Sequence, residues 1–300
     1  MIRTVTGDLD AISGPILAHE HLQIDLCCQK GPEVVLGPAD QEDVAHDLVQ
    51  AKLHGLQAVV DLSVFGSGRD AEGLLKISLQ AHIPVICAAG FYWDPTPQIV
   101  LDSSVEFLRD KMIADVTLGV DGTDIRAGII KIGTDREVSP AAEKLFIAAA
   151  LASIATGAAV ITHTSAVEQA AWHVATLTAA GMDPSRILIS HMGAARSVDQ
   201  LITLGRSGVM MGIDKVGFIA RRSNAELADL VAEACAAGLE QQIILSSDVA
   251  RRDRLLRRGG SSYSAVFVDF YPMLLARGVS QAKINIMMCH NPHSILNFAI

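Results

Sequence analysis

The 300-residue chain lacks several features that mark particular classes of protein. It has no Lys/Arg-rich run with interleaved aromatic residues, and its formal net charge is -9, which argues against nucleic acid as a partner. Its 5 cysteines form no C-x-x-C pair and are odd in number, so we expect no disulfide framework. It also lacks a secretory leader pattern and any apolar run of the ~18 residues that a membrane span needs. We therefore expect a cytoplasmic protein with no membrane contact.

What the chain has in quantity is apolar residues, which make up 50% of its composition. A chain of this length and composition can bury a large core, and nothing in the sequence demands a second domain. Barrels of alternating strands and helices commonly reach ~200 to 250 residues or more as one domain. We therefore predict one domain over residues 1–300.

Short β-branched or apolar runs alternate with longer segments of helical period along the whole chain. The helical segments are predicted at 40–54, 70–81, 104–118, 139–156, 166–180, 198–205, 223–237, 263–276 and 280–298. The strands are predicted at 16–21, 57–64, 84–90, 127–133, 158–163, 186–191, 208–214 and 242–248. Apolar strands that alternate with helices favour a buried parallel sheet, and a closed (β/α)8 TIM barrel is the most economical arrangement. An open doubly wound sheet is the alternative, but no Gly-x-Gly-x-x-Gly turn follows the first strand.

The barrel makes a further prediction, because active sites of such barrels lie at the C-terminal ends of the strands. A His-x-His pair ends the first strand, and its two imidazoles project from one face of an extended backbone. Such a pair alone also occurs without a metal. Other candidates for the same rim end or nearly end later strands, and the full set is His19, His21, Lys131, His163, His191 and Asp248.

These residue types suit a divalent transition metal, since zinc and its neighbours bind imidazole nitrogen and carboxylate oxygen. Four histidines and one aspartate are too many for one catalytic metal and too few to saturate two. Lys131 lies in an apolar strand, where an ammonium is costly and the amine tends to lose its proton. A neutral amine can add carbon dioxide to form a carbamate that bridges two cations. The alternative is that Lys131 pairs with an aspartate or binds substrate.

Several segments resemble the phosphotriesterase-related family of the amidohydrolase superfamily. The principal matches are 17–22 (LAHEHL), 121–135 (DGTDIRAGIIKIGTD), 161–164 (ITHT), 187–192 (ILISHM) and 245–248 (LSSD), and shorter ones occur at 65–70, 90–92 and 291–292. The resemblance extends from about residue 3 to residue 298. It implies a (β/α)8 barrel with a binuclear metal centre, for which zinc is the expected metal and manganese or cobalt the alternative. It places His19, His21 and Asp248 at the more buried metal, His163 and His191 at the more exposed one, and carboxylated Lys131 between them.

The resemblance also implies the chemistry. A water shared by two cations ~3.5 to 4 Å apart would lose a proton near neutral pH and attack the substrate as hydroxide. Asp248 would accept the proton and return it to the leaving alkoxide of a lactone. Members of the family include phosphotriesterases, quorum-sensing lactonases and lactonases of phosphorylated sugars.

Some positions depart from the family pattern or concern substrate binding. The stretch 191–195 lacks the acidic cluster that many members use to pass protons outward, so we expect no such relay. Lys215 and Arg251 resemble the cationic clamp of the sugar-phosphate lactonases, and Tyr92, together with Trp93, either walls the pocket or belongs to the core. Three later arginines of this loop are expected to form a solvated face, and they are Arg254, Arg257 and Arg258.

The prediction is therefore a metal-dependent hydrolase of a lactone or carboxylic ester, with a phosphorylated sugar lactone as one candidate substrate. An acyl-homoserine lactonase with slow phosphotriesterase activity is the first alternative. A barrel that binds a ligand without catalysis is the second. The expected partner is a small molecule, and exposed apolar residues near Phe65 and in the final helices allow a homodimer.

Overall fold

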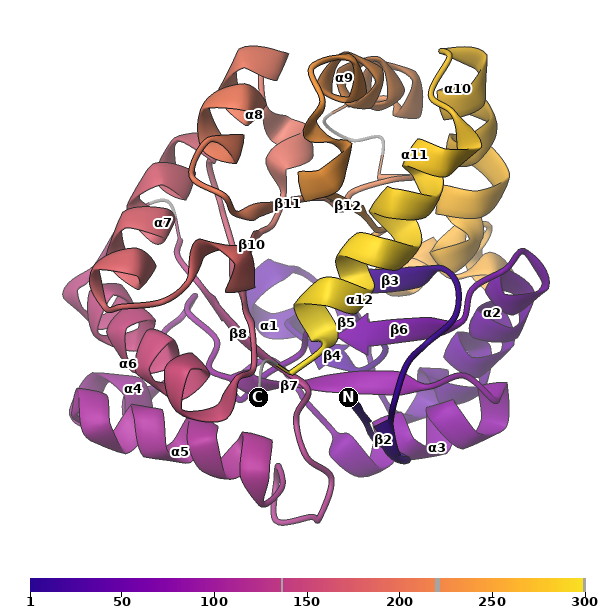
Figure 1. Cartoon of the computed structure of the whole chain (residues 1–300). Coiled ribbons are helices and arrows are strands. Elements are labelled where there is room, and N and C mark those ends of the chain that lie inside the picture. Colours follow the sequence, from indigo (N-terminus) through magenta and orange to yellow (C-terminus); the bar gives the residue numbers. More distant parts are fainter. Residues whose placement is uncertain (136, 219–221, 299–300) are drawn as a thin grey trace.

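The computed structural model describes residues 1–135, 137–218 and 222–298. Its central sheet holds eight parallel strands in the order β12-β11-β10-β9-β8-β7-β6-β3, which curl into a nearly closed barrel inside a ring of helices (Figure 1). The predicted (β/α)8 barrel is thus confirmed. The strands are β3 (Ile16–Glu20), β6 (Ala58–Asp61), β7 (Val85–Gly90), β8 (Ile129–Gly133), β9 (Val160–His163), β10 (Ile187–Ile189), β11 (Met210–Ile213) and β12 (Ile243–Leu245).

The helices cover the outer face of this sheet, so most strand residues are buried on both faces, as is usual for a parallel sheet. Ser139 caps the first turn of α6 by accepting the Ala142 N–H, and Ser223 forms a capping box with Glu226 at α9. The long helices between strands are α2 (Gln41–Leu53), α3 (Ala71–Ala81), α5 (Val105–Thr117), α6 (Pro140–Thr156), α7 (Ala170–Ala179), α8 (Val198–Gly205) and α9 (Asn224–Ala236). The shorter ones are α1 (Cys27–Lys30), α4 (Gln98–Asp102), α10 (Tyr271–Ala276), α11 (Gln281–Asn285) and α12 (Asn291–Leu296).

The predicted elements differ from the observed ones mainly at their ends. Several strands stop before the predicted ligand residues, which lie on the loops that follow. The predicted helices 263–276 and 280–298 are each interrupted by a π-helical turn, at Val266–Phe270 and Ile286–His290. Each turn ends two residues before a proline, Pro272 or Pro292, which lacks the N–H that would continue regular hydrogen bonding.

Two small antiparallel pairs were not predicted, because their strands are only two or three residues long. The first consists of β1 (Ile2–Thr4) and β2 (Gly7–Leu9), and the second of β4 (Ile24–Asp25) and β5 (Val35–Leu36). Phe298 lies against the first pair, where its N–H donates to the Met1 carbonyl oxygen at 3.2 Å and the Arg3 guanidinium lies 4.1 Å from the centre of its ring. Among the described residues, no helix combines the length and apolarity required to cross a membrane.

Candidate metal centre

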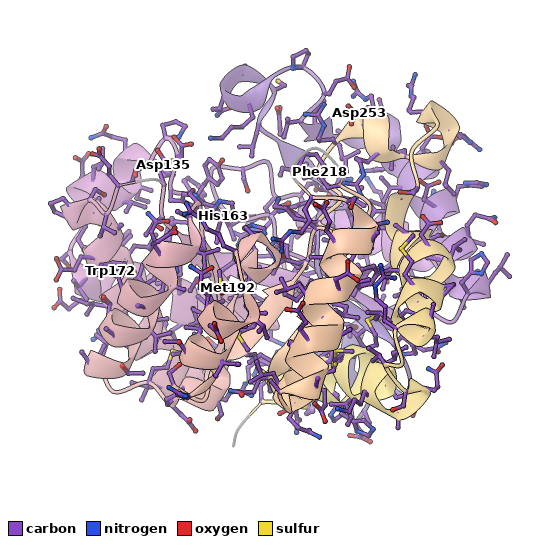
Figure 2. The ribbon with its side chains drawn as sticks, turned by 90° about the horizontal axis from the view of Figure 1, so that it is seen from above. Asp135, His163, Trp172, Met192, Phe218 and Asp253 are labelled. Carbon is purple, nitrogen blue, oxygen red and sulfur yellow. The ribbon has the colours of Figure 1, made fainter. Side chains whose placement is uncertain are left out.

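The predicted ligand residues lie at or just beyond the C-terminal ends of their strands. His19 belongs to β3, Lys131 to β8 and His163 to β9, while His21, His191 and Asp248 follow their strands. His191 and Asp248 both have left-handed backbones, with φ of 66° and 49°. Such conformations are costly for residues other than glycine and persist where surrounding contacts impose them, often at functional sites. Figure 2 shows His163, Asp135, Phe218 and Asp253 gathered toward one end of the barrel.

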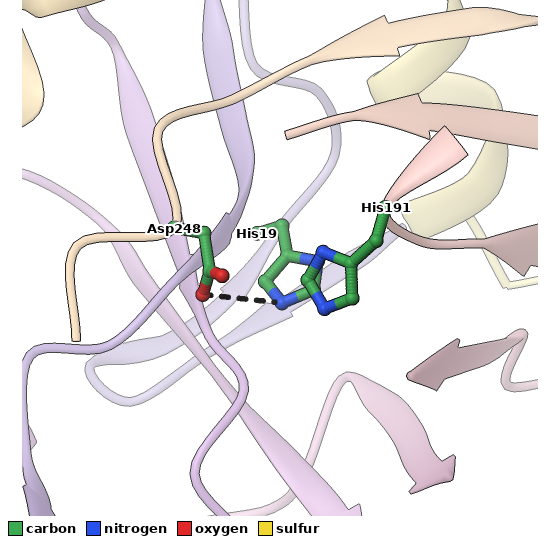
Figure 3. Close-up of side chains that lie close together, drawn as sticks. All are labelled: His19, His191 and Asp248. Carbon is green, nitrogen blue, oxygen red and sulfur yellow. Dashed lines mark ion pairs between the residues drawn. The ribbon is translucent and has the colours of Figure 1, made fainter. Parts of the chain in front are cut away.

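The two imidazoles of the His-x-His pair converge on one carboxylate oxygen. The Nε2 atoms of His19 and His21 each lie 3.6 Å from Oδ1 of Asp248. Ligand atoms around a tetrahedral zinc ion are separated by about 3.3 Å, given metal-ligand distances of about 2.0 to 2.1 Å. In Figure 3, His191 lies beside His19, and the ligand atoms of His19, His191 and Asp248 are all within 4.8 Å of one another. This spacing fits a metal ion.

Asp214, which the sequence analysis did not single out, orients two of these histidines. Its carboxylate oxygens lie 2.8 Å from Nδ1 of His19 and 2.8 Å from Nδ1 of His191. The Nε2 atoms of both rings are thereby directed toward the centre, as in carboxylate-histidine-metal triads. Ser63 has the same effect on His21, since its Oγ lies 2.8 Å from Nδ1 of that ring. The available signal was an acidic residue at the end of the predicted strand 208–214.

His163 presents Nδ1 to the centre, whereas His191 presents Nε2. Its Nδ1 lies 2.8 Å from Nε2 of His191, and its ring stacks on Trp93 with centroids 4.8 Å apart. Gly133 makes this stacking possible, because a Cβ there would lie 2.6 Å from the Trp93 ring and 2.7 Å from Cβ of His163. His163 is therefore held between an aromatic wall and the neighbouring imidazole.

Lys131 is the most unusual side chain of the cluster. It is 1% exposed, and its Nζ has no hydrogen-bond partner among the described residues. Burial lowers the pKa of Lys131 to about 7, although Asp214 and Asp248 act in the opposite direction. Gly90 allows the neighbouring strand to approach, since a Cβ at Gly90 would lie 1.9 Å from the carbonyl oxygen of Lys131. A buried amine whose pKa is lowered in this way loses its proton more readily than an exposed lysine, which fits the requirement for carbamate formation.

The protonation states of the imidazoles also suit a metal. Burial lowers the pKa of His21 to about 3 and that of His191 to about 4, so both rings are neutral near pH 7. Neutral imidazole is the form that binds metals. With carboxylate oxygen and imidazole nitrogen as donors, the cluster fits zinc or a neighbouring divalent ion.

The three predicted substrate-binding residues differ in their neighbours and in their exposure to solvent. Lys215 Nζ lies 2.5 Å from Oδ2 of Asp248, the oxygen that does not face the β3 imidazoles. Burial acts to raise the pKa of Asp248, but Lys215 is the first of several charges that hold it well below the usual range. Arg251 pairs with Asp253 at 2.6 Å on the exposed loop. Tyr92 is buried, with its ring centroid 4.7 Å from that of Trp93.

One prediction about the loop after β12 was wrong. Arg254 is only 8% exposed, whereas Arg257 and Arg258 are exposed as predicted. The Arg254 guanidinium donates to the Val216 carbonyl oxygen at 3.2 Å and lies 5.7 Å from the centre of the Phe218 ring. Lys215 Nζ lies 5.5 Å from the centre of the same ring. Two cations therefore approach Phe218 beside Asp248.

Comparison with known proteins shows the family of this chain. The model of the phosphotriesterase family matches residues 1–296. The phosphotriesterase homology protein of Escherichia coli is 31% identical over 93% of this chain and 97% of its own. A crystal structure of that protein with phosphate in its active site has a TM-score of 0.91 at 30% identity and covers 95% of this chain and 99% of its own.

Two other relatives differ in the activities that their names give. An N-acetyltaurine hydrolase of Tetraodon nigroviridis is 28% identical over 99% of this chain and 98% of its own. A protein engineered for organophosphate hydrolysis from a weak promiscuous lactonase has a TM-score of 0.86 at 26% identity, covering 99% of this chain and all (100%) of its own. With the family model matching almost every residue and the barrel carrying the cluster at its rim, this chain belongs to the phosphotriesterase family of hydrolases.

Proposed function

We propose that the protein is a two-metal hydrolase that opens a lactone or cleaves a carboxylic ester carrying an anionic group. The observation that supports this most directly is the convergence of His19, His191 and Asp248, together with the buried amine of Lys131, which interacts electrostatically with Asp248 and has no hydrogen-bond partner among the described residues. The family is typically dependent on two metals, and the donor set fits them. A carbamate on Lys131 would complete the ligand set with a bridging carboxylate.

Separate residues would bind the metals, orient the ligands and transfer protons. His19, His21 and Asp248 would hold one cation, and His163 and His191 the other, with Asp214 and Ser63 fixing the rings. Bound divalent metals would supply Lewis acidity and lower the pKa of a coordinated water. Asp248 would accept a proton from the attacking water and return it to the leaving alkoxide. Trp93 would shield the His163 side of the site from solvent.

The anionic part of the substrate is proposed from the cations beside Asp248. Lys215 is partly exposed and contacts Oδ2 of Asp248, while Arg254, which has little exposure, approaches the same Phe218 ring as Lys215. A guanidinium and an ammonium together suit phosphate, carboxylate or sulfonate. Arg251 stays a proposed rim contact, because its guanidinium would have to leave Asp253 to reach a ligand. Tyr92 is proposed to support the pocket wall through Trp93.

A second candidate is hydrolysis of an amide that carries an anionic group. The observation that favours it is the same pair of cations, since the N-acetyltaurine hydrolase relative acts on an amide with a sulfonate. A panel that includes neutral and phosphorylated lactones, acyl-homoserine lactones, aryl esters, a phosphotriester and N-acylated aminosulfonates would test both candidates. Each would be assayed with zinc, manganese and cobalt. Turnover of esters or lactones above the others supports the proposal.

Metal content distinguishes the hydrolase from a barrel that only binds a ligand. The proposal requires about two equivalents of divalent metal per chain after purification in its presence. A chain that takes up none and hydrolyses nothing would refute the hydrolase and favour the binding protein. Homodimerisation also stays a proposal, supported by the 44% exposure of Phe65 and testable by sedimentation.

Removing the ammonium of Lys215 should change substrate preference. In Lys215→Ala, we expect kcat/KM for an anionic lactone to fall about 10- to 100-fold further than for a neutral one, the range of a charge-assisted hydrogen bond. The ratio of kcat/KM for the anionic lactone to kcat/KM for the neutral one corrects for the lost contact with Asp248, because that loss affects both substrates. Arg251→Ala should lower the same ratio if Arg251 reaches the ligand. Arg257→Ala, on the same loop but paired with Asp43, is the matched control. Equal losses on both substrates would contradict the cationic site.

A further inference from the structure

The barrel has an irregular seam beside the candidate metal centre. The sheet order places β12 and β3 at its two ends, and no regular ladder joins these two strands within the described residues. Hydrogen bonds beyond the end of β12 join them instead. The Asp248 N–H donates to the His19 carbonyl oxygen at 3.1 Å, and the His21 N–H donates to the Val249 carbonyl oxygen at 3.1 Å. The backbone that carries Asp248 is thus attached directly to the His-x-His strand.

A side chain completes this seam. Oε1 of Glu20 accepts the Ser247 N–H at 2.7 Å, and Oε2 accepts the Val249 N–H at 2.8 Å. The two donors flank Asp248, whose left-handed φ of 49° lets successive N–H groups point toward β3. Successive N–H groups arranged in this way form a concave nest that binds anions. Glu20 is fully buried (0% exposed), which raises its pKa, whereas the hydrogen bonds from the Val249 and Ser247 N–H groups favour the ionised carboxylate.

We infer that Glu20 is a positioning residue that holds Asp248 in place for the metal centre. The effect of Glu20 on metal binding rests on the proposed function, whereas its hydrogen bonds to the backbone do not depend on that function. Both oxygens of Glu20 are engaged by these backbone N–H groups, and Glu20 is not among the residues whose ligand atoms converge, which are His19, His191 and Asp248. It therefore touches neither metal nor substrate, and it acts through the backbone on both sides of Asp248.

A carboxylate suits this position better than any neutral group of the same size. Both oxygens accept a backbone N–H, which requires two acceptors on one planar group. Glutamine offers one acceptor and places an NH2 group against the second N–H. Buried Arg254 also interacts electrostatically with Glu20 and Asp248 and partly balances their charge. In Glu20→Gln we therefore expect Asp248 to lose its fixed orientation while the side-chain volume stays the same.

The first test is metal affinity in a double-mutant cycle. Affinity for cobalt and zinc, measured by competition with a chromogenic chelator, should fall about 10- to 100-fold in Glu20→Gln, the usual range for residues that support metal ligands. In an Asp248→Asn background, Glu20→Gln should cause no further loss, because Glu20 acts through Asp248. Additive losses, or unchanged affinity in the single variant, would overturn the inference.

A matched control separates positioning from general destabilisation. Asp47 is another fully buried carboxylate (0% exposed), and it accepts hydrogen bonds from the Leu256 N–H and the Ser262 hydroxyl in the loop after β12. Asp47→Asn should lower the melting temperature while leaving metal affinity unchanged. Loss of affinity in both variants, in proportion to lost stability, would count against a specific role for Glu20.

A metal-free measurement keeps the inference independent of the proposed function. Amide hydrogen exchange at 247–249 should become at least about tenfold faster in Glu20→Gln than in the wild type, since two hydrogen bonds are weakened or lost. Unchanged exchange there would refute the positioning role even if the protein binds metal. A wild-type chain that takes up no metal, but shows this exchange difference, would refute the proposed metal centre and leave the role of Glu20 intact.

Discussion

Replacing Lys131 by alanine is expected to reduce hydrolysis by at least about 100-fold, the upper range for loss of groups that only support metal ligands. The expected loss is large because Lys131 is buried, interacts electrostatically with Asp214 and Asp248, and has an Nζ that no other described residue contacts by hydrogen bond. A small carboxylic acid such as propionate should restore part of the activity and of the metal content. The acid can enter the space left by the side chain, where its carboxylate oxygens would bridge the two metals in place of the carbamate.

A second small molecule of opposite charge, ethylamine, makes the rescue experiment decisive. If Lys131 acts as an ammonium, ethylamine should restore activity in Lys131→Ala and propionate should not. If it acts as a carbamate, only the acid should help. Lys52→Ala, on the exposed end of α2, controls for removal of a surface amine. Because the pKa of Lys131 is lowered to about 7, its amine becomes neutral and able to add carbon dioxide as pH rises through that value.

The sequence was sufficient to predict the convergence of His19, His163 and Asp248, although they are far apart along the chain. The reason is topological: in a (β/α)8 barrel the C-terminal ends of all strands lie at one rim, so a polar residue at each end predicts a shared site. The apolar alternation that predicts the barrel is a property of many residues at once and tolerates errors at the ends of individual elements.

The residues that support the ligands were less accessible to sequence reasoning. Asp214 ends a predicted strand like the ligands themselves, and only its distances to two Nδ1 atoms reveal that it orients histidines. Arg254 lies in an arginine-rich loop, a pattern typical of exposed segments, yet two 3-10 turns at Arg252–Arg254 and Leu256–Arg258 fold the loop so that one arginine is buried. Side-chain direction in a loop depends on backbone turns that composition does not specify.

The same reasoning applies to Glu20. Between two histidines of a His-x-His pair, a glutamate could be read as a solvent-facing residue of an edge strand. Its role depends on the closure of the barrel, which brings residues 247–249 against β3 across more than two hundred positions of sequence. Such long-range contacts between a side chain and the backbone have no local sequence signal.

Asp248→Asn is expected to lower kcat by about 10²- to 10⁴-fold, the range for loss of a general acid or base. Asparagine keeps the shape of the side chain, but it can neither accept the proton of the attacking water nor pair with Lys215. It also weakens metal binding, because Oδ1 lies 3.6 Å from the Nε2 atoms of both His19 and His21. Excess metal therefore distinguishes the two roles when kcat is measured across a metal titration.

If Asp248 served only as a ligand, saturating metal would restore kcat in Asp248→Asn, and this outcome would contradict its role in proton transfer. If it is also the proton acceptor, metal content should recover at high concentration while kcat stays low. Asp110→Asn, which alters an exposed carboxylate paired with Arg109 on α5, should retain wild-type kcat.

The comparison with Glu20→Gln then distinguishes a misplaced Asp248 from one that has lost its carboxylate. A misplaced but intact Asp248 should regain most of its kcat with excess metal, because its carboxylate still accepts protons, whereas Asp248→Asn should not.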